Sequence, residues 1–153
     1  VLDVRAMAVA NLYTALSGES EHSTICLGNL SPHSADVIVL SKSGGIYPHT
    51  VFCRASTWAE SPAFLCENIR DVMKYSEFKL DWEPVQKVFI TGDMPSQSDF
   101  ISKIQAGVRI PVESWSPLTG LILKSKKVRA LIDSNPADAA RLAPSLGLAL
   151  RRG

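Results

Sequence analysis

The order in which apolar patterns follow one another is the feature that most constrains how this chain can fold. An apolar stripe with helical spacing runs from Asp3 to Gly18. Three strand-like runs follow it at residues 24–27, 36–40 and 46–53, and residues typical of turns separate them. Because these connections are short, the sequence predicts three antiparallel strands after the first helix.

One long helix is predicted after the three strands. It can begin at Thr57, with Glu60 at capping-box spacing, or at Ser61, which precedes a proline. We expect it to end near Lys79. Its expected buried stripe consists of Leu65, Ile69, Val72, Met73 and Ser76.

A strand, a helix and a second strand are predicted next. The strand at 87–91 ends at Gly92, the helix spans 96–107, and the following strand spans 108–112. The strand, glycine turn and helix form one unit of an α/β sheet.

The last part of the chain has weaker patterns. Residues 121–132 are basic and fit neither period clearly. A helical stretch begins at residues 135–136, and Pro144 is a point where it can restart.

This order of elements is typical of a ribonuclease-H-like fold. That fold is a mixed five-stranded sheet with helices packed on its faces in a single α/β domain. With 153 residues, 46% of them apolar, the chain is long enough to bury such a core.

The segment 28–34 is the first candidate binding site. Gly28 allows close approach of a ligand, and Asn29, Ser31 and Ser34 bring polar groups that could face a phosphate. An ordinary hairpin turn rich in Asn, Pro and Ser would explain the same residues.

The second candidate is the turn formed by Thr91, Gly92 and Asp93. It lies between an apolar strand and a capped helix, where ligands of open α/β sheets meet strand ends. A tight turn that merely needs glycine is the alternative.

Several other classes of function find no support. The net charge of +1 offers no footprint for nucleic acid, and no apolar stretch is long enough for direct membrane insertion. The histidines lack metal-ligand spacing and no nucleophile elbow is present, so we predict no metal site and no catalytic residue. Cys26, Cys53 and Cys66 are expected to be buried free thiols. Because the chain starts without Met or a signal pattern, we interpret it as part of a longer protein.

Four segments together resemble a known family. They are a helix at 1–11, a hairpin at 33–37, a strand and turn at 88–92, and a tail at 146–151. Together they resemble the PilM branch of the actin-like superfamily, the type IV pilus assembly proteins related to the cell-division protein FtsA. The similarity extends over nearly the whole chain.

The resemblance implies two parts of a larger actin-like protein. Residues 1–18 would be the helix that links a preceding half to this one, and residues 19–153 would be the second actin-like subdomain.

The resemblance also implies a nucleotide site that has lost part of its chemistry. The family's second phosphate loop has Asp, an apolar residue and Gly, where this chain has Cys26, Leu27 and Gly28, so the carboxylate that would organise Mg²⁺ is missing. The adenosine-side turn resembles Thr91-Gly92-Asp93, with Asp93 in place of a second glycine. ATP and Mg²⁺ are therefore the implied cofactors, and these two differences weigh against them.

The leading hypothesis is a structural scaffold. The resemblance implies a cytoplasmic protein, peripheral to the inner membrane, that docks the cytoplasmic tail of a membrane assembly protein and supports a pilus or secretion-type machine. Self-association is a further interaction to consider. The alternative is a nucleotide-dependent switch or weak ATPase that uses the two candidate segments. A sugar or acetate kinase fragment ranks last, because Cys26 stands where its catalytic acid would be expected.

Overall fold

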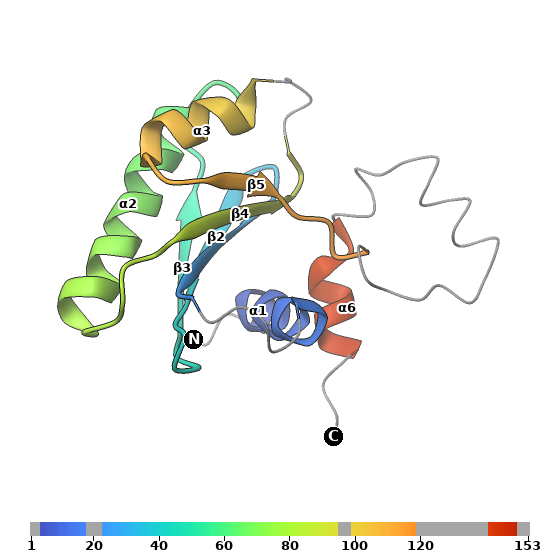
Figure 1. The fold of residues 1–153 in the computed structure, drawn as a ribbon. Coiled ribbons are helices and arrows are strands. Elements are labelled where there is room, and N and C mark those ends of the chain that lie inside the picture. Colours follow the sequence, from blue (N-terminus) through green and yellow to red (C-terminus); the bar gives the residue numbers. More distant parts are fainter. Residues whose placement is uncertain (1–3, 18–22, 95–98, 119–140, 150–153) are drawn as a thin grey trace.

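A five-stranded mixed sheet forms the centre of the protein (Figure 1). The structure is a computed structural model that describes residues 4–17, 23–94, 99–118 and 141–149. The strands lie in the order β3-β2-β1-β4-β5, with β2 antiparallel to both β3 and β1, and β4 parallel to both β1 and β5. Their bounds are Ile25–Leu30 for β1, Ser34–Leu40 for β2, Ile46–Phe52 for β3, Lys87–Gly92 for β4 and Val112–Ser114 for β5.

Helices cover both faces of this sheet. Helices α1 (Val4–Ser17) and α6 (Ala143–Ala149) pack on one face, and α2 (Pro62–Lys79) and α3 (Phe100–Val108) pack on the other (Figure 1). The ribonuclease-H-like fold class predicted from the order of the patterns is therefore confirmed. No helix within the described residues combines the length and the apolar character needed to cross a membrane.

Strand β1 is buried along its whole length because it faces both helical layers. Successive side chains of a strand point to opposite faces. Cys26 and Leu30 accordingly belong to the cluster under α2 and α3, whereas Ile25 and Leu27 belong to the cluster under α1 and α6. Each fully buried aliphatic side chain contributes roughly 1.5–3 kcal/mol to stability.

The predicted loop at 28–34 is shorter than expected. Gly28 and Asn29 lie in β1 and Ser34 lies in β2, so the turn contains only residues 31–33. Gly28 pairs with Val37 on one side and with Ile90 on the other. Pairing with β2 and β4 therefore overrides the turn preference of Gly28 and Asn29, and the expectation that they form a loop was wrong.

The prediction of a strand at residues 108–112 was also wrong. Helix α3 continues through Gly107 to Val108, and the strand β5 begins only at Val112. Gly107 is required for packing, since the Cys66 side chain occupies the place of a Cβ there. Arg109, the residue after Val108, caps the end of the helix. Its φ of 65° is left-handed, and its N–H donates to the Gln105 carbonyl.

The long helix α2 largely confirms its prediction. It starts with Pro62 directly after Ser61, the second of the two proposed start points, and it ends at Lys79 as expected. Four of the five stripe residues are buried, while Met73 is only partly buried and Cys66 takes a place that was not predicted. All three cysteines are free thiols, as predicted, but only Cys26 and Cys66 are buried, so the expected burial of Cys53 was wrong. The patterns at 121–132 and 135–136 lie outside the described residues.

One edge of the sheet carries a proline. The Cys53 N–H donates to the His33 carbonyl, so hydrogen-bonded pairs between β2 and β3 recur at every second residue from there. Pro48, opposite Ile38, falls in a non-bonded pair. Its nitrogen, which has no hydrogen, therefore faces the open edge.

Helices α1 and α6 approach each other closely at Gly147. A Cβ at this position would overlap the backbone carbonyl of Ala8. We expect Gly147→Val to lower the free energy of unfolding by about 2 kcal/mol, because added atoms must push the two helices apart. Urea denaturation measures the change. The matched control is Leu148→Ala on the exposed side of α6, where an equal loss would contradict this explanation.

Candidate functional site

A row of polar side chains crosses four neighbouring strands near one end of the sheet. Thr50 of β3 pairs in register with Asp36 of β2, Asp36 pairs with Asn29 of β1, and Asn29 pairs with Thr91 of β4. Asp36 lies two residues before Ile38, which contacts the cluster under α1 and α6, so the row faces these helices. We call these four residues the polar row.

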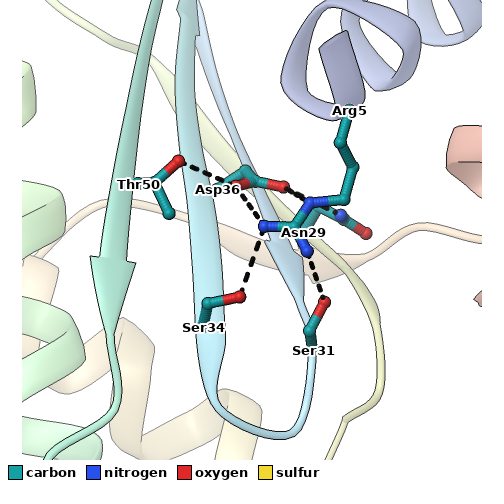
Figure 2. A network of polar contacts seen from close by, with 6 residues as sticks. All are labelled: Arg5, Asn29, Ser31, Ser34, Asp36 and Thr50. Atoms are coloured by element: carbon teal, nitrogen blue, oxygen red, sulfur yellow. Dashed lines mark hydrogen bonds and ion pairs between the residues drawn. The ribbon is translucent and has the colours of Figure 1, made fainter. Parts of the chain in front are cut away.

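Arg5 of α1 binds the middle of the polar row (Figure 2). Its Nε lies 2.7 Å from Oδ2 of Asp36, and its Nη2 donates to Oδ1 at 2.9 Å. The guanidinium also donates to the hydroxyls of Ser31 at 3.4 Å and Ser34 at 3.3 Å. One arginine therefore ties α1 to the strand β2 and to the turn that precedes it.

The Asp36 carboxylate has no exposure to solvent. Besides Arg5, it accepts hydrogen bonds from Asn29 Nδ2 at 3.3 Å and from Thr50 Oγ1 at 3.0 Å. A buried charge is tolerated only when it is paired and hydrogen-bonded in this way. Asn29, Asp36 and Thr50 of the polar row thus form, with Arg5, an internal hydrogen-bonded network around one carboxylate.

The turn at 31–33 is also held from its outer side. Trp58, which is fully buried, donates its indole N–H to the Ser31 carbonyl at 2.8 Å. The Ser31 N–H donates to the Ser34 carbonyl at 2.7 Å, and Pro32 has no N–H to offer. The first part of the turn therefore has no backbone amide left for an external anion.

The turn after β4 lies beside the end of β1. Gly92 has a φ of 89°, and a Cβ there would overlap the backbone of Leu30, so only glycine fits. The Asp93 N–H donates to the Leu30 carbonyl at 2.8 Å, and the Asp93 carboxylate pairs with Arg141 at 2.6 Å. The buried Thr91 hydroxyl has no hydrogen-bond partner in the part of the chain that the structure describes.

The two candidate segments meet at one cavity of about 350 Å³. Its lining consists of Asn29, Leu30, Ser31, Pro32, Asp93, Arg141 and Pro144. The volume is at the lower end of the range for small-molecule sites. Three of the predicted site residues, Asn29, Ser31 and Asp93, therefore come together here.

Other predicted site residues lie elsewhere. Ser34 contacts Arg5 rather than the cavity, and Gly28 packs against Ile90 in the core under α2 and α3. Thr91 belongs to the polar row, and Gly92 shapes the second turn.

Cys26, where the resemblance implies a missing carboxylate, is a core residue of β1. It lies in β1 four residues before the end of the strand, is completely buried, and contacts the core under α2 and α3. Burial raises the pKa of its thiol to about 12. A carboxylate at this position would face the same unfavourable desolvation. The polar residue at the end of β1 is Asn29.

Sequence patterns missed Arg5, Asp36, Trp58 and Arg141. Arg5 and Asp36 interrupt an apolar helix and an apolar strand with opposite charges, and this was the available signal for a buried pair. No group of three or more His, Cys, Asp or Glu side chains that could hold a metal occurs within residues 4–17, 23–94, 99–118 and 141–149. The carboxylates of the site are already engaged by arginines, so the residues present do not form a Mg²⁺ ligand set.

The strand order and the helices on both faces of the sheet are those of a ribonuclease-H-like fold. The solved structure of a PilM–PilN type IV pilus biogenesis complex contains a chain with this fold, with a TM-score of 0.62 and 15% sequence identity. The alignment covers 99% of this chain and 52% of that chain, so this protein spans about half the length of its structural relative.

A Bacteroides thetaiotaomicron protein described as having an actin-like ATPase fold and unknown function also matches, with a TM-score of 0.46 and 10% identity. The alignment covers 82% of this chain and 43% of the chain of that protein. No protein-family model matches the sequence, and no curated protein does.

Replacing Asp36 by Asn is expected to lower the free energy of unfolding by about 2–3 kcal/mol. The Asn amide nitrogen would face groups that are themselves donors, and Arg5 would lose its counter-charge. Denaturation followed by circular dichroism measures the loss. Asp99→Asn is the control, because Asp99 pairs with Lys103 on the exposed surface and its removal should leave stability nearly unchanged. Equal effects of the two substitutions would show that the buried network is unimportant.

Proposed function

We propose that this protein is a scaffold module of a PilM-like cytoplasmic protein, which docks the cytoplasmic tail of a membrane assembly protein. In this proposal it supports assembly of a type IV pilus or a secretion-type machine and stays at the inner membrane through its partner. Helix α1 would join it to a preceding actin-like half. The observation that carries the proposal is the structural similarity to a chain of the PilM–PilN complex over 99% of this chain.

The geometry of the candidate site supports a structural role rather than a catalytic one. The hydroxyls of Ser31 and Ser34 accept from Arg5, and the Ser31 amide is used within the turn. A phosphate cradle needs donors aimed outward. Here the groups that would supply them hold the protein's own helix and turn together.

The proposed docking is tested with a synthetic peptide that spans the cytoplasmic tail of the PilN-type protein from the same organism. We expect the full-length protein to bind it with a dissociation constant of about 10 μM or tighter, measured by isothermal titration calorimetry. A scrambled peptide of equal composition is the control. Absence of binding, or equal binding of both peptides, would refute the scaffold proposal.

A nucleotide-dependent switch is the second candidate, and the cavity lined by Asn29, Ser31 and Asp93 favours it. In that case Mg-ATP would raise the melting temperature of the full-length protein by mass action. The scaffold proposal predicts a change of less than about 1 °C at ligand concentrations of about 5 mM. A shift of several degrees, absent with Mg²⁺ alone, would favour the switch.

A further inference from the structure

The Arg5 guanidinium lies against the hydroxyl side chains of the turn between β1 and β2. It lies within hydrogen-bond distance of both hydroxyls that flank the turn, those of Ser31 and Ser34. Figure 2 shows the guanidinium between these hydroxyls and the Asp36 carboxylate, and this carboxylate also accepts hydrogen bonds from Asn29 and Thr50. The polar groups near this turn are thus already bound by a side chain of the same chain.

Displacement of this arginine by an anion is unfavourable for two separate reasons. If the guanidinium left, the Asp36 carboxylate would stay fully buried without its counter-charge. The arriving anion would then lie beside that carboxylate, and two like charges at such a distance repel each other strongly.

The turn itself offers little compensation. The Ser31 amide donates to Ser34, Pro32 has no N–H, and the Ser31 carbonyl is bound by Trp58. An anion could therefore not replace the lost ion pair with backbone hydrogen bonds from this part of the turn.

We infer that the Arg5–Asp36 pair is an autoinhibitory contact: Arg5 acts as an internal occupant that closes the Ser31–Ser34 turn to phosphate-bearing ligands. The contact deepens the proposed scaffold function, on which this inference rests, because it keeps α1 attached to the sheet whether nucleotide is present or absent. Arg5 is here a positioning residue with no role in chemistry.

Three variants of the full-length protein test the contact, with inorganic phosphate and Mg-ATP as the probes. Arg5→Ala leaves the Asp36 carboxylate in place and should not respond to either probe. Arg5→Ala combined with Asp36→Asn removes both charges and should gain a rise in melting temperature of about 3 °C or more. Arg70→Ala is the matched control, since Arg70 donates to the Gly107 carbonyl near α3 and should behave like the wild type.

The results separate an autoinhibitory contact from a purely structural ion pair. A structural pair predicts no ligand response in any variant, so a silent double variant would overturn the inference. A wild-type protein that responds as strongly as the double variant would overturn it as well.

Nuclear magnetic resonance of the wild type provides a second test that needs no variant to fold. The Nε–H signal of Arg5 and the amide signals of Ser31 and Ser34 should remain unchanged when phosphate is added, and movement of these signals would refute the contact. Binding of the PilN-type peptide is measured on the same samples. If the peptide fails to bind while the Arg5, Ser31 and Ser34 signals stay unchanged with phosphate, the scaffold proposal is refuted but the closure of the turn by Arg5 is not.

Discussion

A carboxylate that is completely buried must be surrounded by donors, and the arrangement around Asp36 meets this requirement with groups from three other elements. Arg5 comes from α1, Asn29 from β1 and Thr50 from β3. A slip of one residue in the pairing of β2 would turn the charge toward the apolar cluster under α2 and α3. The same interaction therefore specifies strand register and helix position, which packing of apolar side chains alone would determine less strictly.

The order of elements could be predicted because hydrophobic periodicity is a local property of the sequence. The errors lie where distant contacts decide the local structure. Gly28 and Asn29 favour a turn, but pairing with strands on both sides keeps them extended. Gly107 looks like a helix stop, but the neighbouring Cys66 side chain requires a glycine inside the helix. Neither neighbour can be recognised from spacing along the chain.

The candidate site was predicted in part for a comparable reason. Asn29 lies near the end of β1 and Asp93 directly follows β4; because these strands are parallel, their carboxyl ends meet at one edge of the sheet, so the proximity of the two residues follows from topology. Arg5 precedes Asp36 by 31 residues in the sequence, and no local pattern connects the two. The resemblance implied a missing carboxylate at Cys26, and the burial of this side chain in the core under α2 and α3 could not be read from the motif.

The proline in β3 bears on whether a second chain can extend the sheet at this edge. Edge strands invite extension of a sheet by a neighbouring chain, which is a common start of aggregation and of open-ended filaments. Pro48 removes one donor from the middle of that edge, and β5, at the opposite edge, has only three residues. Uncontrolled growth through the backbone is thus disfavoured at both sides. Contacts with other proteins are left to side chains on the helical faces and loops, where individual substitutions can tune them.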